Sequence, residues 1–308
     1  MAFVQRTTTN QPTVSLLLSN YDGMPHLPRA LAGLCGQTRP ATEILVLDDG
    51  SADDSLGVIE AFAARTPGMT VLRNDVNRGL MYSIDRLLHA ATGDYIVWAA
   101  SDDELLPTFL ERSMAALERF PQAGLCCSEL VLEQADGTIR NAARTEPDRF
   151  GLIGLPAFLP PDAVLRRFAR GFLPISSNTV VARRDAVLAA GGFPPALAWH
   201  ADWFTFHAVA LRFGVCPIPE ALSLYRCAED SYSAGGMRDP ARQHPVLVAV
   251  ADRLRRPENR DLRRAFLAAP SLLSVFGHAP IAAYRRTMRH WGLARRYRRW
   301  CAAQEATG

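Results

Sequence analysis

Two apolar runs in this chain stop abruptly at a pair of aspartates. The run at 95–99 leads to Asp102 and Asp103, and the run at 43–47 leads to Asp48 and Asp49. Ligands of open α/β sheets collect at the carboxyl ends of buried parallel strands, which have such apolar runs. Neighbouring carboxylates repel each other unless solvent, a cation or hydrogen-bond donors stabilise them, and oxygen ligands beside a phosphate suit Mg²⁺ or Mn²⁺. Asp102 and Asp103 therefore form either a cation site or a turn that caps the next helix, and this stretch alone leaves both open.

The elements that would position these carboxylates alternate between strand and helix. Short apolar runs alternate with segments whose apolar residues have helical spacing, which predicts an α/β fold whose parallel strands are joined by right-handed crossovers. Beyond residue 120 we expect a strand at 124–132, a loop at 140–162, a strand at 175–182 and an Arg-rich helical region from about 240. The expected strands before residue 120 are 14–18, 43–47, 69–73 and 95–99, and the expected helices are 26–36, 55–65, 80–91 and 107–120.

Composition narrows the class of protein. The chain has 308 residues, nearly half of them apolar and a fifth charged, so it is globular. A formal charge of +3 gives no argument for nucleic acid as a partner. Six cysteines without a C-x-x-C pair read as reduced thiols of a cytosolic protein. The polar N-terminus lacks the apolar core of a signal peptide, and the longest apolar stretch, 266–284, is interrupted by Pro and Gly and would span a membrane poorly.

Two common nucleotide motifs are missing from the sequence. There is no G-x-G-x-x-G after the first expected strand and no G-x-x-x-x-G-K-[ST] anywhere in the chain. A nucleotide bound here would therefore be held by carboxylates and an aromatic ring rather than by a glycine-rich phosphate loop.

An ordered set of short motifs resembles the family-two inverting glycosyltransferases, which have the GT-A fold. The resemblance covers roughly residues 13–233 and implies a mostly parallel central sheet flanked by helices, here with a C-terminal helical extension. The matching stretches are Val14-Ser15 leading to Tyr21, Gln37-Thr38, the run from Glu43 to Asp53, Asn77-Arg78-Gly79, Ala91 to Ile96, Ser101-Asp102-Asp103 ahead of Pro107, Gly191-Gly192-Phe193, Asp202-Trp203, and Pro219-Glu220 running to Tyr225-Arg226.

The resemblance implies a donor site for a nucleoside-diphosphate sugar. It places Tyr21 against the nucleobase, the Asp48-Asp49 pair on base or ribose, and Arg78 near base or phosphate. Stacking combined with hydrogen bonds to the base edge is a sound way to hold a base. The alternatives are a half-buried turn aromatic for Tyr21, a helix-capping turn for the aspartates, and a surface ion pair for Arg78.

For the reacting end of the donor, the resemblance implies that Asp102 is the ligand of Mg²⁺ or Mn²⁺, with Asp103 beside it. The cation would bridge the diphosphate and absorb charge that develops on the leaving nucleotide. The first aspartate of the family's D-x-D element is replaced by Ala100. Arg226 and the loop Ser231-Tyr232-Ser233 resemble the mobile segment that closes over the diphosphate, although Cys227-Ala228 stands where that segment usually has histidine.

For the acceptor end, Asp202 matches the family's general base. An inverting displacement needs a carboxylate opposite the leaving group that takes the proton of the attacking hydroxyl. The family often has Glu-Asp at this point, whereas this chain has Ala201-Asp202. The alternative for Asp202 is an N-cap of the next helix, which is compatible with a role as base. Trp203 is expected to pack in the core.

We therefore expect three segments: an N-terminal tail at 1–12, a GT-A domain at 13–233 and an Arg-rich helical extension at 234–308. Residues 13–120 would form the nucleotide-sugar half of the domain and 121–233 the acceptor half. The extension is either a helical cap on the domain, the favoured interpretation, or a basic amphipathic surface that contacts anionic lipid at the inner face of the membrane. Its apolar stripe would comprise Leu272, Leu273, Val275, Phe276, Ile281, Tyr284, Met288 and Trp291.

The expected function is transfer of a sugar from a nucleoside-diphosphate sugar to a hydroxyl of a glycan or lipid-linked glycan, as in surface polysaccharide assembly. The competing interpretation is a non-catalytic GT-A module that binds nucleotide sugar or glycan, suggested by Ala100 and Ala201. A nucleotidyltransferase would need a basic glycine-rich loop after the first strand, and the sequence has no such loop.

Overall fold

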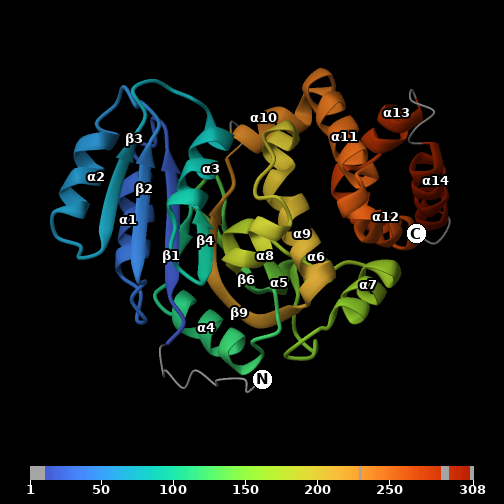
Figure 1. Cartoon of the computed structure of the whole chain (residues 1–308), viewed down its shortest axis with the longest axis horizontal. Coiled ribbons are helices and arrows are strands. Elements are labelled where there is room, and N and C mark those ends of the chain that lie inside the picture. The colour runs from blue at the N-terminus through green and yellow to red at the C-terminus, as the bar shows by residue number, and fades with distance from the viewer. Residues whose placement is uncertain (1–10, 229–230, 286–290, 306–308) are drawn as a thin grey trace, which may run out of the picture.

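A nine-stranded mixed sheet forms the centre of the protein (Figure 1). The computed structural model describes residues 11–228, 231–285 and 291–305. The strands run in the order β3-β2-β1-β4-β8-β6-β9-β5, and β7 pairs with β6. They are β1 (Val14–Asn20), β2 (Glu43–Asp48), β3 (Met69–Arg73), β4 (Tyr95–Ala99), β5 (Glu104–Leu105), β6 (Leu125–Glu133), β7 (Ile139–Asn141), β8 (Val180–Arg183) and β9 (Val215–Arg226).

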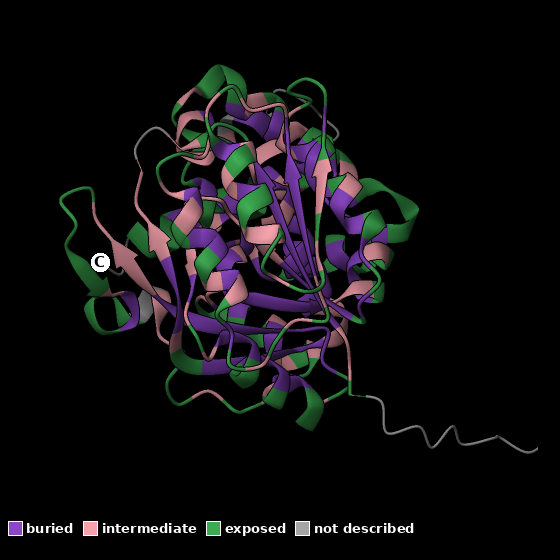
Figure 2. Ribbon diagram, turned by 90° about the vertical axis from the view of Figure 1, so that its left-hand side faces the viewer, coloured by how far each residue is buried: buried purple, intermediate pink, exposed green. Residues whose placement is uncertain are grey.

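The first four strands in the sheet are parallel, as the alternation of strand and helix predicted. Strand β1 pairs in parallel with β2 and β4, and β2 with β3. The other half is mixed, since β8 is antiparallel to both of its neighbours whereas β6 and β9 are parallel. Figure 2 shows that the central strands are buried along most of their length, which explains their continuous apolar sequences.

Helices cover both faces of the sheet and bury two apolar clusters. One cluster joins α1 and α4 to one face, and the other joins α3, α7, α8 and α9 to the opposite face. The helices of this part are α1 (Leu27–Cys35), α2 (Ser55–Ala63), α3 (Leu80–Ala90), α4 (Phe109–Arg119), α5 (Ala142–Thr145), α6 (Pro147–Phe150), α7 (Pro161–Arg170), η1 (Ser177–Thr179), α8 (Arg184–Ala189), η2 (Pro195–His200) and α9 (Ala201–Phe213).

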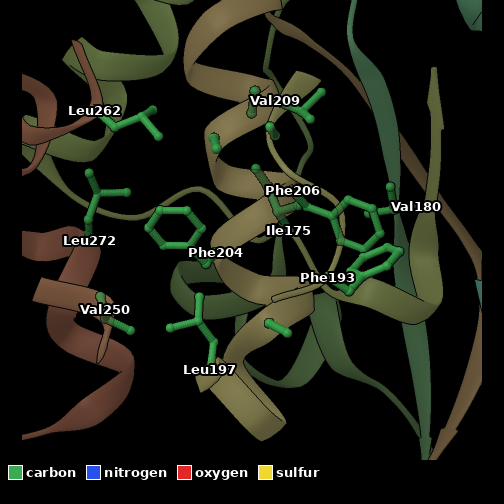
Figure 3. Packing of buried hydrophobic residues seen from close by; sticks show 14 of the residues in the cluster. Ile175, Val180, Phe193, Leu197, Phe204, Phe206, Val209, Val250, Leu262 and Leu272 are labelled. Atoms are coloured by element: carbon green, nitrogen blue, oxygen red, sulfur yellow. The ribbon is translucent and has the colours of Figure 1, made fainter. Parts of the chain in front are cut away.

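The C-terminal extension is packed on the second cluster rather than separated from it. Figure 3 shows Phe204 of α9 facing Val250, Leu262 and Leu272 of the extension, while Phe206 points toward the sheet. The helices of this region are α10 (Tyr232–Arg238), α11 (Pro240–Arg255), η3 (Pro257–Asn259), α12 (Arg260–Ala268), η4 (Pro270–Phe276), α13 (Ala279–Arg285) and α14 (Trp291–Glu305). Among the described residues, no helix combines the length and apolar character that crossing a bilayer requires.

The apolar stripe expected on the extension is largely turned inward. Leu272, Leu273, Phe276 and Tyr284 are buried, Ile281 packs against the same cluster, and Val275 is exposed. Met288 and the side chain of Trp291 lie outside the described residues. This packing agrees with the interpretation of the extension as a helical cap.

Two local expectations differ from the structure. The strand expected at 175–182 begins only at Val180, because residues 177–179 form the 3-10 turn η1. The region 140–162, expected to be loop, contains β7, α5 and α6 and the start of α7. The strand from 215 to 226 is continuous, and its register against β6 shifts between Ser128 and Leu130, where the ladder passes the residues Pro219 and Glu220.

Candidate active site

The loop that carries Tyr21 is tied to the loop that follows β2. Asn20 Nδ2 donates to Ser51 Oγ, and the backbone N–H groups of Asp22, Gly23 and Met24 donate to the side chains of Ser51, Ser55 and Asp53. In the reverse direction, Asp22 Oδ1 accepts from the N–H of Ala52 at 2.8 Å. Tyr21 therefore projects from a braced loop at the carboxyl end of β1, with 48% of its surface exposed.

Asp48 and Asp49 are buried and hydrogen-bonded within the protein. Asp48 accepts from the backbone N–H and the hydroxyl of Ser51, and it is fully shielded from solvent. Asp49 Oδ1 accepts from Asn74 Nδ2 at 2.6 Å and from the N–H of Arg78 at 2.9 Å, and its Oδ2 accepts from the N–H of Gly79 at 2.8 Å. Neither residue caps α2, whose N-cap is Asp54. The pair thus fixes the loop after β2 and the stretch 74–79.

Glycine is required between these two loops. Gly50 has φ of +73°, and a Cβ there would lie 2.8 Å from the carbonyl carbon of Val76. The close approach brings the stretch 74–79 onto the end of β2. Arg78 is exposed on that stretch, and its guanidinium lies 5.6 Å from the ring centre of Tyr82.

Asp102 and Asp103 follow β4, and neither caps a helix. Residues 104–105 form β5, and α4 begins only at Phe109 with Thr108 as its N-cap. Asp102 is half-buried, whereas Asp103 is buried and accepts from the N–H of Arg226 at 3.0 Å. Burial, followed by the charge of Asp102, raises the pKa of Asp103 to about 8, although the Arg226 N–H and the amide of Asn178 lower it. A positive charge beside Asp102 and Asp103 would therefore be stabilised.

Arg226 meets the acidic pair through its backbone. It is the last residue of β9, and the side chain is half-buried. The expected loop at 231–233 is instead the start of α10, with Ser231 as N-cap accepting from the N–H of Ala234.

Asp202 lies in the first turn of α9 and is held by two donors. Ser177 Oγ of η1 donates to Asp202 Oδ2 in a short hydrogen bond, and the N–H of Trp203 donates to Oδ1 at 2.7 Å. The N-cap of this helix is His200, so Asp202 is not the cap. Burial raises the pKa of Asp202, and the two donors partly offset that rise. Ala198, just ahead of the helix, has φ of +43°, an unfavourable conformation for alanine.

Three carboxylates, those of Asp102, Asp103 and Asp202, act electrostatically on Tyr225. The pKa of this tyrosine is raised by burial and then by the charges of Asp103, Cys227, Asp102 and Asp202. Aspartates that are 99 residues apart in sequence therefore share one electrostatic environment near the ends of β4 and β9. No expectation assigned a role to Tyr225, Ser177 or Asn178. Ser177 and Asn178 lie in a stretch expected to be strand, and no local pattern of residues indicates that they face Asp202 and Asp103.

The Asp202 end of the site is bordered by a polar and aromatic cluster that includes the extension. Gln243 of α11 bridges two side chains, accepting from Trp199 Nε1 at 2.7 Å and placing its amide nitrogen 2.9 Å from His200 Nε2. Burial lowers the pKa of His200 to about 4, so it is neutral near pH 7. Trp203 packs edge-to-face on Phe266 and Phe276, as expected for a core residue.

The residues present offer a partial metal site. Within the described part of the chain, no three His, Cys, Asp or Glu side chains converge as a metal site. Asp102 and Asp103 supply oxygen donors of the kind that Mg²⁺ and Mn²⁺ prefer, and burial together with the charge of Asp102 raises the pKa of Asp103. The pair therefore fits a cation whose remaining ligands come from a diphosphate and water.

All six cysteines are free thiols, as expected.

Curated relatives match about two thirds of this chain. YibD of Escherichia coli, an uncharacterized glycosyltransferase, is 24% identical over 202 residues, which cover 65% of this chain and 58% of YibD. An uncharacterized protein of Mycobacterium tuberculosis, MT1568, is 28% identical over 226 residues, covering 70% of this chain and 67% of that protein. The match thus spans about three fifths of YibD's length.

Solved structures share the fold over nearly the whole chain. Staphylococcus aureus TarS 1-349 in complex with UDP-GlcNAc superposes with a TM-score of 0.60 at 17% identity, covering 93% of this chain and 89% of TarS. The mannosyltransferase PcManGT of Pyrobaculum calidifontis, in complex with GDP-Man and Mn²⁺, gives 0.60 at 18% identity, covering 97% and 77%. These likenesses confirm the GT-A fold.

The sequence profile described as Glycosyl transferase family 2 matches residues 15–171, about half of the chain. That segment runs from β1 through Tyr21, the two aspartate pairs and β6 to the end of α7. The chain belongs to glycosyl transferase family 2.

Proposed function

We propose that this glycosyltransferase is metal-dependent and inverting, and that it moves a sugar from a nucleoside-diphosphate sugar to a hydroxyl of a glycan or lipid-linked glycan in surface polysaccharide assembly. The observation that carries the proposal is that Asp102, Asp103 and Asp202 all lie within electrostatic reach of Tyr225, with Asp103 held by the N–H of Arg226 and Asp202 by Ser177. The nucleotide sugars bound to TarS and to PcManGT, and the Mn²⁺ bound to the latter, support it by analogy.

The donor base would lie on the exposed ring of Tyr21, at the braced end of β1. Asp49 Oδ2 accepts from the N–H of Gly79, and a carboxylate oxygen can accept about two hydrogen bonds. The second position suits an N–H of a base or a ribose hydroxyl. Asp48, fully buried, would act by holding the loop, and exposed Arg78 would approach the base or phosphate from the other side.

Asp102 and Asp103 would hold Mg²⁺ or Mn²⁺ against the donor diphosphate, with the Arg226 segment close by. When bound, the cation supplies positive charge that stabilises the departing nucleoside diphosphate. The backbone N–H of Arg226 keeps Asp103 oriented, and Asp102 is the more accessible of the two carboxylates.

Asp202 would act as the base. As the acceptor hydroxyl attacks the anomeric carbon, its proton passes to a carboxylate oxygen of Asp202, a C–O bond forms, and the bond to the diphosphate oxygen breaks with its electron pair. Ser177 and the N–H of Trp203 hold the carboxylate in place. Attack on the face opposite the leaving group inverts the anomeric configuration.

The test is product analysis with a panel of nucleotide sugars and glycan acceptors, read by proton NMR of the new anomeric centre. The proposal expects transfer with inverted configuration, dependent on Mg²⁺ or Mn²⁺ and abolished by EDTA. A product with retained configuration would contradict the inverting mechanism. Nucleotide-sugar binding without any transfer or donor hydrolysis would instead favour the non-catalytic module suggested by Ala100 and Ala201.

A further inference from the structure

The charge of this chain is divided unevenly between its two parts. Residues 234–308 contain 15 arginines and five acidic residues, a formal charge of +10 with neutral histidines. Residues 1–233 contain 19 arginines and 26 acidic residues, a formal charge of −7. A negatively charged surface would therefore attract the extension and repel the rest of the protein, which would fix the orientation of approach.

The apolar side of α14 is occupied by the protein itself. Ala294, Tyr297 and Cys301 are buried in the core, and the exposed side carries Arg295, Arg296, Arg298 and Arg299. Among the described side chains of α14, the exposed face therefore carries arginines and not an apolar stripe. Contact with a bilayer here would be electrostatic, and insertion of α14 into lipid would require undocking it.

A groove of about 500 Å³ lies along this arginine face. Arg296 is fixed over it by a 3.0 Å hydrogen bond from Nη1 to the carbonyl of Leu267. A cavity of about 80 Å³ shares two lining residues with the groove and adds Arg255 and Arg263. The groove is lined by Leu267, Ala268, Pro270, Gly292, Arg295, Arg296 and Arg299, so cationic side chains stand beside an apolar floor.

We propose that this groove and its arginines bind the phosphate headgroups of an anionic bilayer. Guanidinium groups pair well with phosphate oxygens, and the apolar floor suits the glycerol and upper acyl part of a phospholipid. Single-stranded nucleic acid would need exposed rings for stacking, whereas the described residues that line the groove include no aromatic ring. This inference deepens the proposed function, on which it rests, by naming the surface that would bring the enzyme to a lipid-linked acceptor.

The strength of the contact follows from the number of arginines. Each basic residue near an anionic membrane surface strengthens adsorption roughly five-fold, so removing three should weaken it about 100-fold. The attraction should fade as salt rises, because exposed charges more than a Debye length from the surface are screened.

The experiment is vesicle co-sedimentation of the full chain without any nucleotide sugar, using phosphatidylcholine alone and a roughly 3:1 mixture of phosphatidylcholine and phosphatidylglycerol. The variants are Arg295→Ser/Arg296→Ser/Arg299→Ser and the same triple to Lys. A matched control, Arg65→Ser/Arg119→Ser/Arg140→Ser, removes equal charge from exposed positions outside the extension. Circular dichroism checks that each variant is folded.

We expect wild type, the Lys triple and the control to bind anionic vesicles, and the Ser triple to lose about 100-fold in affinity. Equal losses in the control and the Ser triple would overturn the proposal, because net charge alone would then explain binding. Equal binding to neutral vesicles, or binding to a single-stranded oligonucleotide but not to vesicles, would also overturn it. Since no donor is present, a failure here is distinguishable from a failure of the transferase assay.

Discussion

Replacement of Asp202 by asparagine separates its chemical role from its structural one. In the structure one oxygen of Asp202 accepts from Ser177 and the other from the N–H of Trp203. Asparagine keeps the shape, its oxygen can still accept from Trp203, and its NH₂ can donate to the hydroxyl of Ser177. The fold should therefore persist, while the side chain can no longer take a proton from the acceptor.

The expected loss follows from the role of a general base. Such a group contributes about 10²- to 10⁴-fold to the rate, or about 3–5 kcal/mol of the barrier. We expect kcat of Asp202→Asn to fall within that range, with the KM of the donor and the Kd of the nucleoside diphosphate nearly unchanged, because the donor site is formed by other residues. The assay is steady-state transfer with donor and acceptor varied separately, beside nucleotide titration of both proteins.

Two results would refute this reasoning. A kcat within about ten-fold of wild type would show that Asp202 is not the base. A large loss of nucleotide affinity would place Asp202 in the donor site instead. Unchanged thermal unfolding of the variant is the control that excludes a folding defect.

Three further predictions concern the side chains of Ser177, Tyr21 and His207. Ser177→Ala removes a hydrogen bond that lowers the pKa of Asp202, so the acid limb of the pH–kcat profile should move to higher pH while donor KM stays constant; an unmoved limb would exclude Ser177 as a positioning residue. Tyr21→Ala should weaken nucleotide binding by about 1–3 kcal/mol through loss of stacking, whereas Tyr21→Phe should retain it; equal affinities in titrations of the two variants would contradict base stacking. Burial lowers the pKa of His207 to about 4, so between about pH 6.5 and 4 the unfolded state takes up a proton that the folded state refuses, and stability falls as pH falls. In urea unfolding at pH 7 and pH 4.5, His207→Gln should lose less stability than wild type, by an amount on the order of 1–3 kcal/mol, and parallel losses would disprove this account.

Residues 13–120 could be predicted from sequence because β1, β2 and β4 lie inside the sheet and are buried along most of their length. Strands β3 and β4 have the predicted bounds, whereas β1 is two residues longer and β2 one residue longer than predicted. Continuous apolar runs that end in aspartates leave few alternatives for such strands. The placement of the acidic pairs at the carboxyl ends of β2 and β4 follows directly from this topology.

Residues 121–233 were harder to predict because contacts between residues far apart in the sequence decide their local structure. Residues 177–179 have strand-like neighbours, but they form a turn that brings Ser177 to Asp202, 25 residues away. Strand β9 runs through the prolines at 217 and 219, and its register against β6 shifts at this point. The spacing of apolar residues in the sequence indicates neither the contact of Ser177 with Asp202 nor the register of β9 against β6.

The extension shows another limit of pattern reading. An apolar stripe beside arginines describes a membrane-facing helix and a core-facing helix equally well. The structure buries Leu273 and Tyr284 in the cluster shared with α9, and only this packing assigns the stripe to the core. The roles of Tyr21, Asp48, Asp49, Arg78, Asp102, Asp103, Asp202 and Arg226 in binding and catalysis stay predictions.

The most direct test of the central claim is calorimetric titration of UDP, GDP, dTDP and CDP in Mn²⁺ and in EDTA, with wild type and Asp102→Ala. We expect one nucleotide to bind tightly to wild type in Mn²⁺, and to lose that affinity both in EDTA and in the variant. Such a result would establish the donor site and identify its base. Failure of folded wild type to bind any of the four, or binding that ignores both the cation and Asp102, would contradict the proposed metal-dependent donor site.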